Sequence, residues 1–565
     1  MVMKNGKTES KSFLKDNQGA ALIIIILIGI TLTILGTTAV IISTNETKSS
    51  SNQRNYYTAF YAADGGANQS LYLLRNAINL NLQENIGSVT NGSTINQYVT
   101  NNDSSGFLGA YAGFTKIDNQ TATLPQINGS LGRGNYSSSI TVTANGSPTK
   151  PDSDVYLFPY NYIIKSEGIG LNNAKSHITL RGSFQVTIKR ATFARFALFT
   201  DDQRNAAGAR VWFTNRTNFN GPVHTNGRLN FARNPSATFT APVTSAGRGC
   251  STCPASKVAN FYNDGAIQTL DADRNGNKDM PIFQAGFKRG VDVISLPNLT
   301  SADIQRKRAL GLNDSDPIPN KTNGVYVETQ GGMIKGGIYI KGPSSSLTMG
   351  IDAQGNGQYT ISQGSTVTVI TVNRKTNQTA VQTGTSTNTY TGLLNGMIFN
   401  DGGNITSLSG KVQRDSQVTI VSSNSINITN DIKYEDYTPG STVNALGTQN
   451  ILGIVSWDGN VTISTASPDN INVHATVMAV NGEFTVTNYS TGSPRGMATV
   501  LGGVIEKFYG AFGTFSGDVQ KSGYGRNFVY DERMGQGSSP PYFPTTGNFS
   551  SQQSGLENTP IWKED

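Results

Sequence analysis

An uninterrupted apolar segment near the N-terminus constrains this chain more than any other feature. From Ala20 to Ile42 it reads AALIIIILIGITLTILGTTAVII, without a charged residue or a proline. As a helix rising 1.5 Å per residue, it spans about 34 Å, which exceeds a hydrocarbon core of about 30 Å. A secretory signal peptide is the alternative, but its apolar region is shorter, about 7–15 residues, and ends at a small-x-small cleavage site that is not evident here. We therefore predict one membrane-spanning helix.

The charges that precede this segment predict its orientation. Lysines outnumber acidic residues in the N-terminal tail, with Lys4, Lys7, Lys11 and Lys15 against Glu9 and Asp16. An excess of lysine holds a flank on the cytoplasmic side. The expected protein is thus a single-pass protein of the cytoplasmic (inner) membrane, with its N-terminus inside and its body outside.

Helical patterning continues beyond the membrane segment. Apolar residues follow at spacings of three and four, the pattern of one face of an amphipathic helix. These residues are Phe60, Ala63, Ala67, Leu71, Leu74 and Ile78. One long helix over 20–80 is the simplest interpretation, although Gly65 and Gly66 are candidates for a kink.

Two short motifs around this helix resemble those of a known family. Gln18-Gly19-Ala20-Ala21-Leu22-Ile23 leads into the apolar run, and Ala59-Phe60-Tyr61-Ala62-Ala63-Asp64-Gly65-Gly66 follows it, after Glu46 and Arg54. Together they resemble the N-terminus of PilX-type minor pilins and the related pseudopilins of type IV pilus and type II secretion machines. The resemblance covers about the first 80 residues.

The resemblance implies processing and partners. In such proteins a prepilin peptidase cuts after the glycine, here between Gly19 and Ala20, and the helix binds other pilins or pseudopilins. The fifth mature residue would be Ile24, where major pilins carry glutamate. This departure favours a minor or accessory role and leaves removal of the leader open.

The rest of the chain predicts a β-rich body. Glycine is abundant at 62 residues and charged residues make up only 14%, a composition that suits short strands joined by tight turns. The expected fold class is α+β, mostly β: a long membrane helix, a pilin-like α/β lobe, and a large β-solenoid-like body, with a β-sandwich as the alternative. The expected division is a cytoplasmic leader at 1–19, the helix at 20–80, the pilin-like lobe at 81–190, a β-rich domain at 191–330, a β-helix-like domain at 331–534 and a flexible tail at 535–565. Loops are expected to dominate 81–150, and strands are expected at 160–164, 177–180 and 184–188.

A second resemblance lies in the body. The block Gly221-Pro222-Val223-His224-Thr225-Asn226-Gly227 and the closing residues Gly523-Tyr524 and Tyr530-Asp531 are similar to a domain of unknown function that accompanies PilX-type N-termini. This resemblance implies no activity. We expect His224 to be a structural, hydrogen-bonded histidine.

An acidic loop and a cysteine pair are the candidate metal and disulfide sites. Oxygen-bearing side chains alternate around Gly276, as a loop that wraps calcium requires; they are Asp271, Asp273, Asn275, Asn277 and Asp279. Position twelve of this EF-hand-like loop is Ile282 instead of glutamate, so a solvated polar turn is the alternative. Cys250 and Cys253 supply only two thiolates of the four ligands zinc needs, so a structural disulfide is expected outside the cytoplasm.

Several functions are disfavoured. The net charge of +7 comes without a basic run interleaved with aromatic residues, so no nucleic-acid partner is expected. No nucleophile or metalloprotease motif marks an active site, and we expect no enzyme. The sequence thus predicts a minor pilin-like structural subunit that takes part in assembly and in display at the cell surface, with a surface glycan or adhesin as a further partner. Whether it serves a pilus, secretion or DNA uptake stays open. The alternatives are a membrane-anchored β-helix adhesin and a polysaccharide-active enzyme.

Overall fold

The computed structural model describes residues 14–152, 154–231, 237–247, 281–437, 449–517 and 519–565. The chain divides into two compact units. Unit 1 holds the described residues up to Ile188 together with Gln553–Asp565, and unit 2 holds Lys189–Gln552. The chain passes between the units twice, in strands β6 and β35.

Unit 1 consists of one long helix, short helices and an antiparallel sheet. The helices are α1 (Leu14–Asn76), the π-helical η1 (Ala77–Asn81), α2 (Leu82–Ile86), α3 (Ser93–Thr100), α4 (Ser104–Ala112) and the short 3₁₀ turn η2 (Leu171–Asn173). The strands are β1 (Thr115–Lys116), β2 (Thr121–Leu131), β3 (Gly134–Ala144), β4 (Thr149–Asp152), β5 (Val155–Ile169), β6 (Lys175–Thr192), β35 (Thr545–Ser554) and β36 (Ile561–Glu564). The predicted continuous helix is confirmed, as are the strands in 160–164, 177–180 and 184–188.

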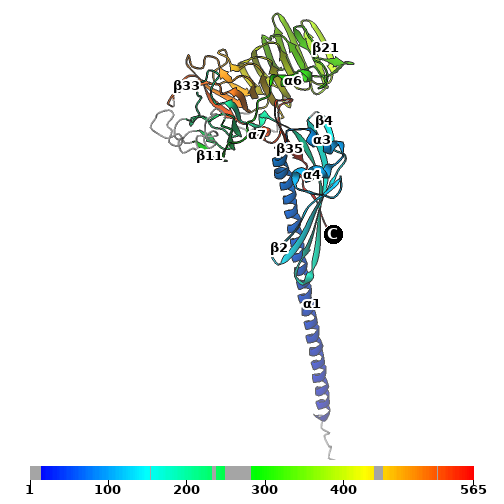
Figure 1. Ribbon diagram of the computed structural model, residues 1–565. Coiled ribbons are helices and arrows are strands. Elements are labelled where there is room, and N and C mark those ends of the chain that lie inside the picture. Colours follow the sequence, from blue (N-terminus) through cyan, green and yellow to red (C-terminus); the bar gives the residue numbers. More distant parts are fainter. Residues whose placement is uncertain (1–13, 153, 232–236, 248–280, 438–448, 518) are drawn as a thin grey trace, which may run out of the picture. The chain divides into compact units, whose positions relative to one another are not determined.

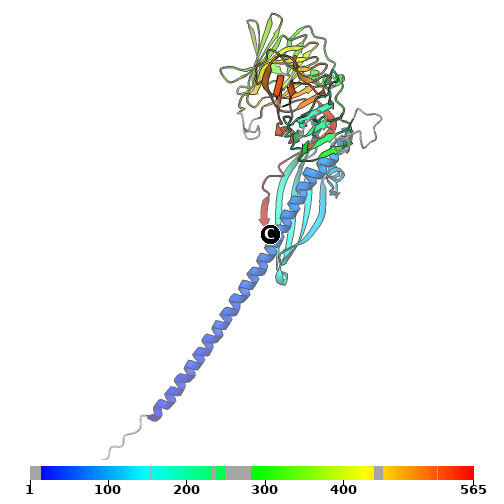
Figure 2. The ribbon, with the colours of Figure 1, turned by 90° about the vertical axis from the view of Figure 1, so that its left-hand side faces the viewer.

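The C-terminal half of α1 packs on this sheet, where β2, β3 and β5 lie beside it (Figures 1 and 2). Along β5 every second residue from Tyr156 to Ile164 is buried, the alternation of a strand with one face on a core. The opposing helix face consists of small residues, and Ala59, Ala62, Ala63 and Ala67 are completely buried. The predicted apolar face is therefore the packed face.

Glycines let the helix and the strands come unusually close. A Cβ built on Gly168 of β5 would lie 1.9 Å from the carbonyl oxygen of Ala59, and one on Gly170 would lie 2.4 Å from that of Asn55. On the helix side, a Cβ on Gly66 would lie 2.6 Å from the Tyr136 ring. The helix runs through Gly65 and Gly66, so Gly66 serves close packing.

Two expectations, for residues 81–150 and for residues 535–565, are wrong. Residues 81–150 contain α3, α4 and the long β2–β3 hairpin where loops were expected, because Ser, Thr and Asn occupy the exposed positions and obscure the pattern. The chain from 535 is not a flexible tail: it contains α7 (Glu532–Gly535) at its start and then β35 and β36, and β36 pairs with β6. Buried Phe549 and Leu556 anchor it.

Unit 2 contains two large sheets and a few short elements. The described strands of the first sheet, in spatial order, are β12 (Phe287–Arg289), β10 (Val243–Ser245), β8 (Val223–Thr225), β7 (Leu198–Asp202), β32 (Val504–Phe508), β29 (Thr476–Ala479), β26 (Ile451–Ser456), β24 (Gln417–Ser422), β22 (Met397–Asp401), β16 (Ile338–Lys341) and β13 (Gly324–Tyr326). Those of the second are β14 (Thr329–Gln330), β15 (Met333–Ile334), β21 (Ser386–Thr391), β20 (Gln378–Thr383), β19 (Thr366–Asn373), β18 (Gly357–Gln363), β17 (Ser346–Ile351), β23 (Ile405–Val412), β25 (Ile426–Tyr434), β28 (Asn472–His474), β31 (Pro494–Leu501), β34 (Val519–Val529) and β33 (Gly513–Ser516), with β27 (Val461–Ile463) and β30 (Phe484–Val486) alongside. Further elements are the pair β9 (Thr238–Phe239) and β11 (Ile282–Phe283), helix α6 (Ala302–Ala309), and the single turns η3 (Phe193–Arg195) and η4 (Leu299–Ser301).

Parallel pairing stacks like residues in register. In the first sheet, Ile338, Ile398, Ile420 and Ile454 are successive partners on β16, β22, β24 and β26. In the second, Ile405, Ile426, Val461 and Phe484 form the corresponding row. All eight are buried. Both rows therefore contribute apolar side chains to one core. From β16 to β29 the chain passes back and forth between the two sheets.

One core joins the two domains that were expected at 191–330 and 331–534. It extends from Phe193 to Phe543. The reason is that β32, near the C-terminus, pairs with β7, so that Val504 lies opposite Leu198. A spatial neighbour so distant in sequence leaves no local signal.

Candidate functional site

The N-terminal half of α1 is an apolar helix that packs on nothing in the described chain. Every side chain from Gly19 to Ser50 is exposed, including those of the apolar run. Threonine hydroxyls in this half donate to backbone carbonyls one turn earlier in the same helix. Thr33 donates to the carbonyl of Gly29 at 2.7 Å, and Thr38 donates to that of Ile34 at 2.7 Å. Such bonding leaves the surface compatible with lipid. This helix is the one that is long and apolar enough to cross a membrane among the described residues.

Small residues occupy one side of this apolar half. Gly29, Thr33, Gly36 and Ala39 are spaced four, three and three apart, so they face the same side. A Cβ added to Gly29 or Gly36 would meet no atom within 4 Å. Small residues in this spacing let two helix backbones approach closely in a membrane. The residues of the expected cut, Gly19 and Ala20, lie within α1 and are exposed.

His224 lies in the interior of unit 2 on β8, in the Gly-Pro-Val-His-Thr-Asn-Gly block. Its Nδ1 is 2.8 Å from Thr244 Oγ1 and its Nε2 is 3.0 Å from Asn226 Oδ1, and its ring stacks on Phe199 at 5.2 Å. Burial lowers its pKa, against the opposing hydrogen bond with Asn226. Both ring nitrogens are thus occupied.

Asn226 explains why the block is polar although it is buried. Its Nδ2 donates to Asp201 Oδ1 at 2.8 Å and to the carbonyl of Ile294 at 2.7 Å, and its Oδ1 accepts from the backbone of Ile294. The histidine and the asparagine therefore tie neighbouring turns of chain together. The expected hydrogen bonding of His224 is confirmed by these contacts, and its structural role stays a prediction.

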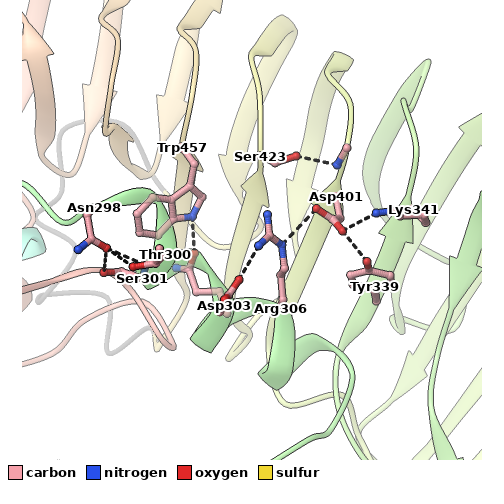
Figure 3. A network of polar contacts seen from close by, with 12 residues as sticks. Asn298, Thr300, Ser301, Asp303, Arg306, Tyr339, Lys341, Asp401, Ser423 and Trp457 are labelled. Atoms are coloured by element: carbon pink, nitrogen blue, oxygen red, sulfur yellow. Dashed lines mark hydrogen bonds and ion pairs between the residues drawn. The ribbon is translucent and has the colours of Figure 1, made fainter. Parts of the chain in front are cut away.

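Unit 2 contains a second polar network, which was not predicted from the sequence (Figure 3). Asp401, at the end of β22, accepts from Arg306 Nε at 3.1 Å, from Tyr339 Oη at 2.6 Å and from Lys341 Nζ at 2.9 Å. Arg306 also contacts Asp303 on α6 at 2.5 Å. The partners lie 60–95 residues apart in sequence, so no local motif reveals them.

This network binds α6 to the first sheet. Burial alone raises the pKa of Asp401, but the hydrogen bonds from Tyr339 and Lys341 and the charge of Arg306 outweigh it, so the pKa is lowered. Burial and the contact with Asp401 raise the pKa of Tyr339. A carboxylate with three donors has little capacity to act as a base, so the arrangement indicates a structural role. Nearby, Trp457 Nε1 donates to Gln305 of α6 at 2.7 Å.

The residues of the expected calcium loop and of the expected disulfide lie outside the part of the chain that the structure describes. They are Asp271, Asp273, Asn275, Asn277 and Asp279 for calcium, and Cys250 and Cys253 for the disulfide. Within the described ranges, no group of three or more His, Cys, Asp or Glu side chains is arranged to hold a metal ion. The calcium site and the disulfide stay predictions.

Comparison with known families covers two segments. Residues 18–68 match the PilX N-terminal family, which confirms the resemblance of the first helix to a PilX-type pilin. Residues 155–253 match a domain of unknown function, DUF4900, which extends from β5 to beyond β10. No curated protein and no solved structure matches the chain. The matched segments contain the apolar half of α1 and the His224 block.

Proposed function

We propose that this protein is a minor pilin-like structural subunit of a type IV pilus or a related pseudopilus. Its α1 helix inserts among the helices of other pilins or pseudopilins, and its β-rich body is displayed outside the membrane. It is a structural component and not an enzyme. The family match over residues 18–68 supports this proposal.

The observation that carries the proposal is that the two halves of α1 have different surroundings. The C-terminal half is buried against its own sheet through Ala59, Ala63 and Ala67. The N-terminal half exposes large apolar side chains, such as Ile25 at 66% and Val40 at 65%. In water this surface is unfavourable at about 25 cal/mol per Å². Lipid and neighbouring helices are the surroundings that suit it.

The lysine-rich tail supports a cytoplasmic N-terminus, with the body outside. In this scheme a prepilin peptidase removes the leader between Gly19 and Ala20 after insertion. The body is a β-solenoid in this proposal, because parallel strands from successive rungs stack in register in both sheets. Its outer surface carries the contacts with a glycan or an adhesin partner.

The first experiment determines the mature N-terminus by mass spectrometry of protein purified from membranes and from sheared surface filaments. A chain beginning at Ala20 is expected in filaments. A chain that retains residues 1–19 in every fraction would contradict processing as a pilin.

The second experiment tests assembly through the small-residue side of α1. Gly36→Ile adds bulk where the protein itself has no atom within 4 Å, so its fold is expected to be unaffected. Thr38→Ile is the matched control, because two residues along the helix is about 200° around it. We expect Gly36→Ile to reduce incorporation into filaments while membrane insertion is unchanged, and Thr38→Ile to have little effect. Equal incorporation of both variants and the parent would contradict the proposed packing.

A further inference from the structure

A large pocket in unit 2 is lined by arginines and aromatic rings. It has a volume of about 680 Å³, within the range of about 300–1,000 Å³ typical of small-ligand sites. Its walls come from the segment after β7 (205–217), from β31, β33 and β34, and from residues next to β30 and β33. Segments more than 250 residues apart in sequence therefore build it.

Cationic groups line this pocket without acidic ones. Arg210, Arg216 and Arg526 are among its lining residues, and none of the described residues that line it is an aspartate or a glutamate. The Nε of Arg526 is buried and has no hydrogen-bond partner in the described chain, while its Nη1 donates to Tyr509 Oη at 3.1 Å. Three guanidinium groups without a carboxylate among the described lining residues favour a ligand of negative charge. The ligand that fits is an anion.

Aromatic rings also line the pocket. Trp212 and Tyr489 are half-buried, and Phe515 is 43% exposed. Arginines accompany them, with Arg210 5.9 Å from the Trp212 ring and Arg216 5.9 Å from the Phe515 ring. An arginine that packs on an aromatic ring has its planar guanidinium group held in one orientation, which suits two parallel hydrogen bonds to a carboxylate. The flat apolar faces of sugar rings stack on exposed aromatic side chains.

We propose that this pocket binds an acidic saccharide, a sugar chain whose rings carry carboxylates, as in a hexuronic acid. The carboxylate contacts the arginines, and the adjacent ring stacks on Trp212 or Phe515. A single-stranded nucleic acid also combines anions with flat rings, but it requires a groove that follows its backbone over several phosphates. A pocket bounded on several sides by β33, β34 and the 205–217 segment favours one or a few sugar units.

The test measures binding by calorimetry with the full-length protein in detergent. The probes are oligogalacturonate as the acidic sugar, cello-oligosaccharide as the neutral one, and an oligothymidylate of similar length. We expect oligogalacturonate to bind, more weakly as salt rises because exposed charges are screened, and the other two probes to bind at least tenfold more weakly. Equal binding of the neutral sugar, tighter binding of the oligonucleotide, or no binding of oligogalacturonate would overturn the proposal.

Variants locate the binding in the pocket. Arg210→Ala and Trp212→Ala change exposed or half-exposed residues, and each is expected to weaken oligogalacturonate binding about tenfold or more. Arg210→Lys keeps the positive charge but loses the planar guanidinium. Its affinity for oligogalacturonate is expected to lie between that of Arg210→Ala and that of the parent. Arg414→Ala, at an arginine of the same unit whose side chain is 65% exposed and lies outside the pocket, is the control. Unchanged binding in both alanine variants at the pocket, or an equal loss in Arg414→Ala, would refute this site.

Discussion

Replacement of Gly168 by alanine tests how closely α1 and its sheet are required to approach. The added Cβ would lie 1.9 Å from the carbonyl oxygen of Ala59 and 2.5 Å from the backbone nitrogen of Ala63. Both atoms belong to the helix backbone, so no change of side-chain rotamer relieves the contact. The helix has to move by more than about 1 Å to restore an ordinary contact distance of about 3.5 Å.

The expected cost follows from two opposing effects. Overpacking a well-packed core typically costs about 1–3 kcal/mol, and a clash with backbone belongs at the upper end. Alanine in a strand otherwise gains about 0.5–1 kcal/mol over glycine, because the unfolded chain has less freedom to lose. We therefore expect the packing of α1 on the sheet to weaken by about 2 kcal/mol.

Hydrogen exchange is the suitable assay, because a protein of two units need not unfold in a single step. Peptides that cover residues 51–76 are followed in the full-length protein in detergent. A loss of about 2 kcal/mol corresponds to a roughly 30-fold lower protection. Gly350→Ala in β17, where an added Cβ meets no atom within 4 Å, is the control and is expected to leave this protection unchanged. Protection in Gly168→Ala within about threefold of the parent would refute the close-approach argument.

Three further predictions concern single contacts. Asp401→Asn is expected to destabilise unit 2 by about 2–3 kcal/mol in thermal unfolding, because it weakens the contact with Arg306 and leaves Lys341 without its carboxylate; an unchanged midpoint would show that the network contributes nothing. Burial raises the pKa of Glu506 well above its usual value near 4.5, against hydrogen bonds from two backbone amides. The folded state therefore binds the Glu506 proton more tightly than the unfolded state does. The stability that this proton contributes is complete below the pKa of Glu506 in the unfolded chain, and it is lost as the pH rises through the pKa of Glu506 in the folded protein. Glu506→Gln is expected to raise the unfolding midpoint more at pH 8 than at pH 5, and a pH-independent difference would argue against a protonated Glu506. Trp562→Ala removes a ring 6.0 Å from Phe60 and is expected to cost about 1 kcal/mol and to speed proteolysis of the C-terminal strand; equal cleavage rates would contradict the role of β36 in holding α1.

The amino-acid sequence alone determined the first helix of this protein. An uncharged run from Ala20 to Ile42 can be satisfied only as a helix in an apolar environment, because every backbone group then has a partner within the segment. The 3.6-residue spacing of Ala63, Ala67 and Leu74 similarly identified the packed face, since periodicity is a local property. Alternating apolar residues identified β5 and β6 for the same reason.

Tertiary structure decided what depends on residues far apart in the chain. The hydrogen-bond donors of Asp401 come from β16 and α6. Arg210 and Arg526 line the same pocket although they lie near opposite ends of the unit 2 sequence. The C-terminal strands appear as a polar tail in sequence because they are stabilised by pairing with β6 and by a few buried anchors such as Leu556. Likewise, the contact of β32 with β7 merges two apparent domains into one core. A local sequence pattern shows which face of a helix or strand is apolar. Which other segment packs against that face depends on the free energy of the whole folded chain.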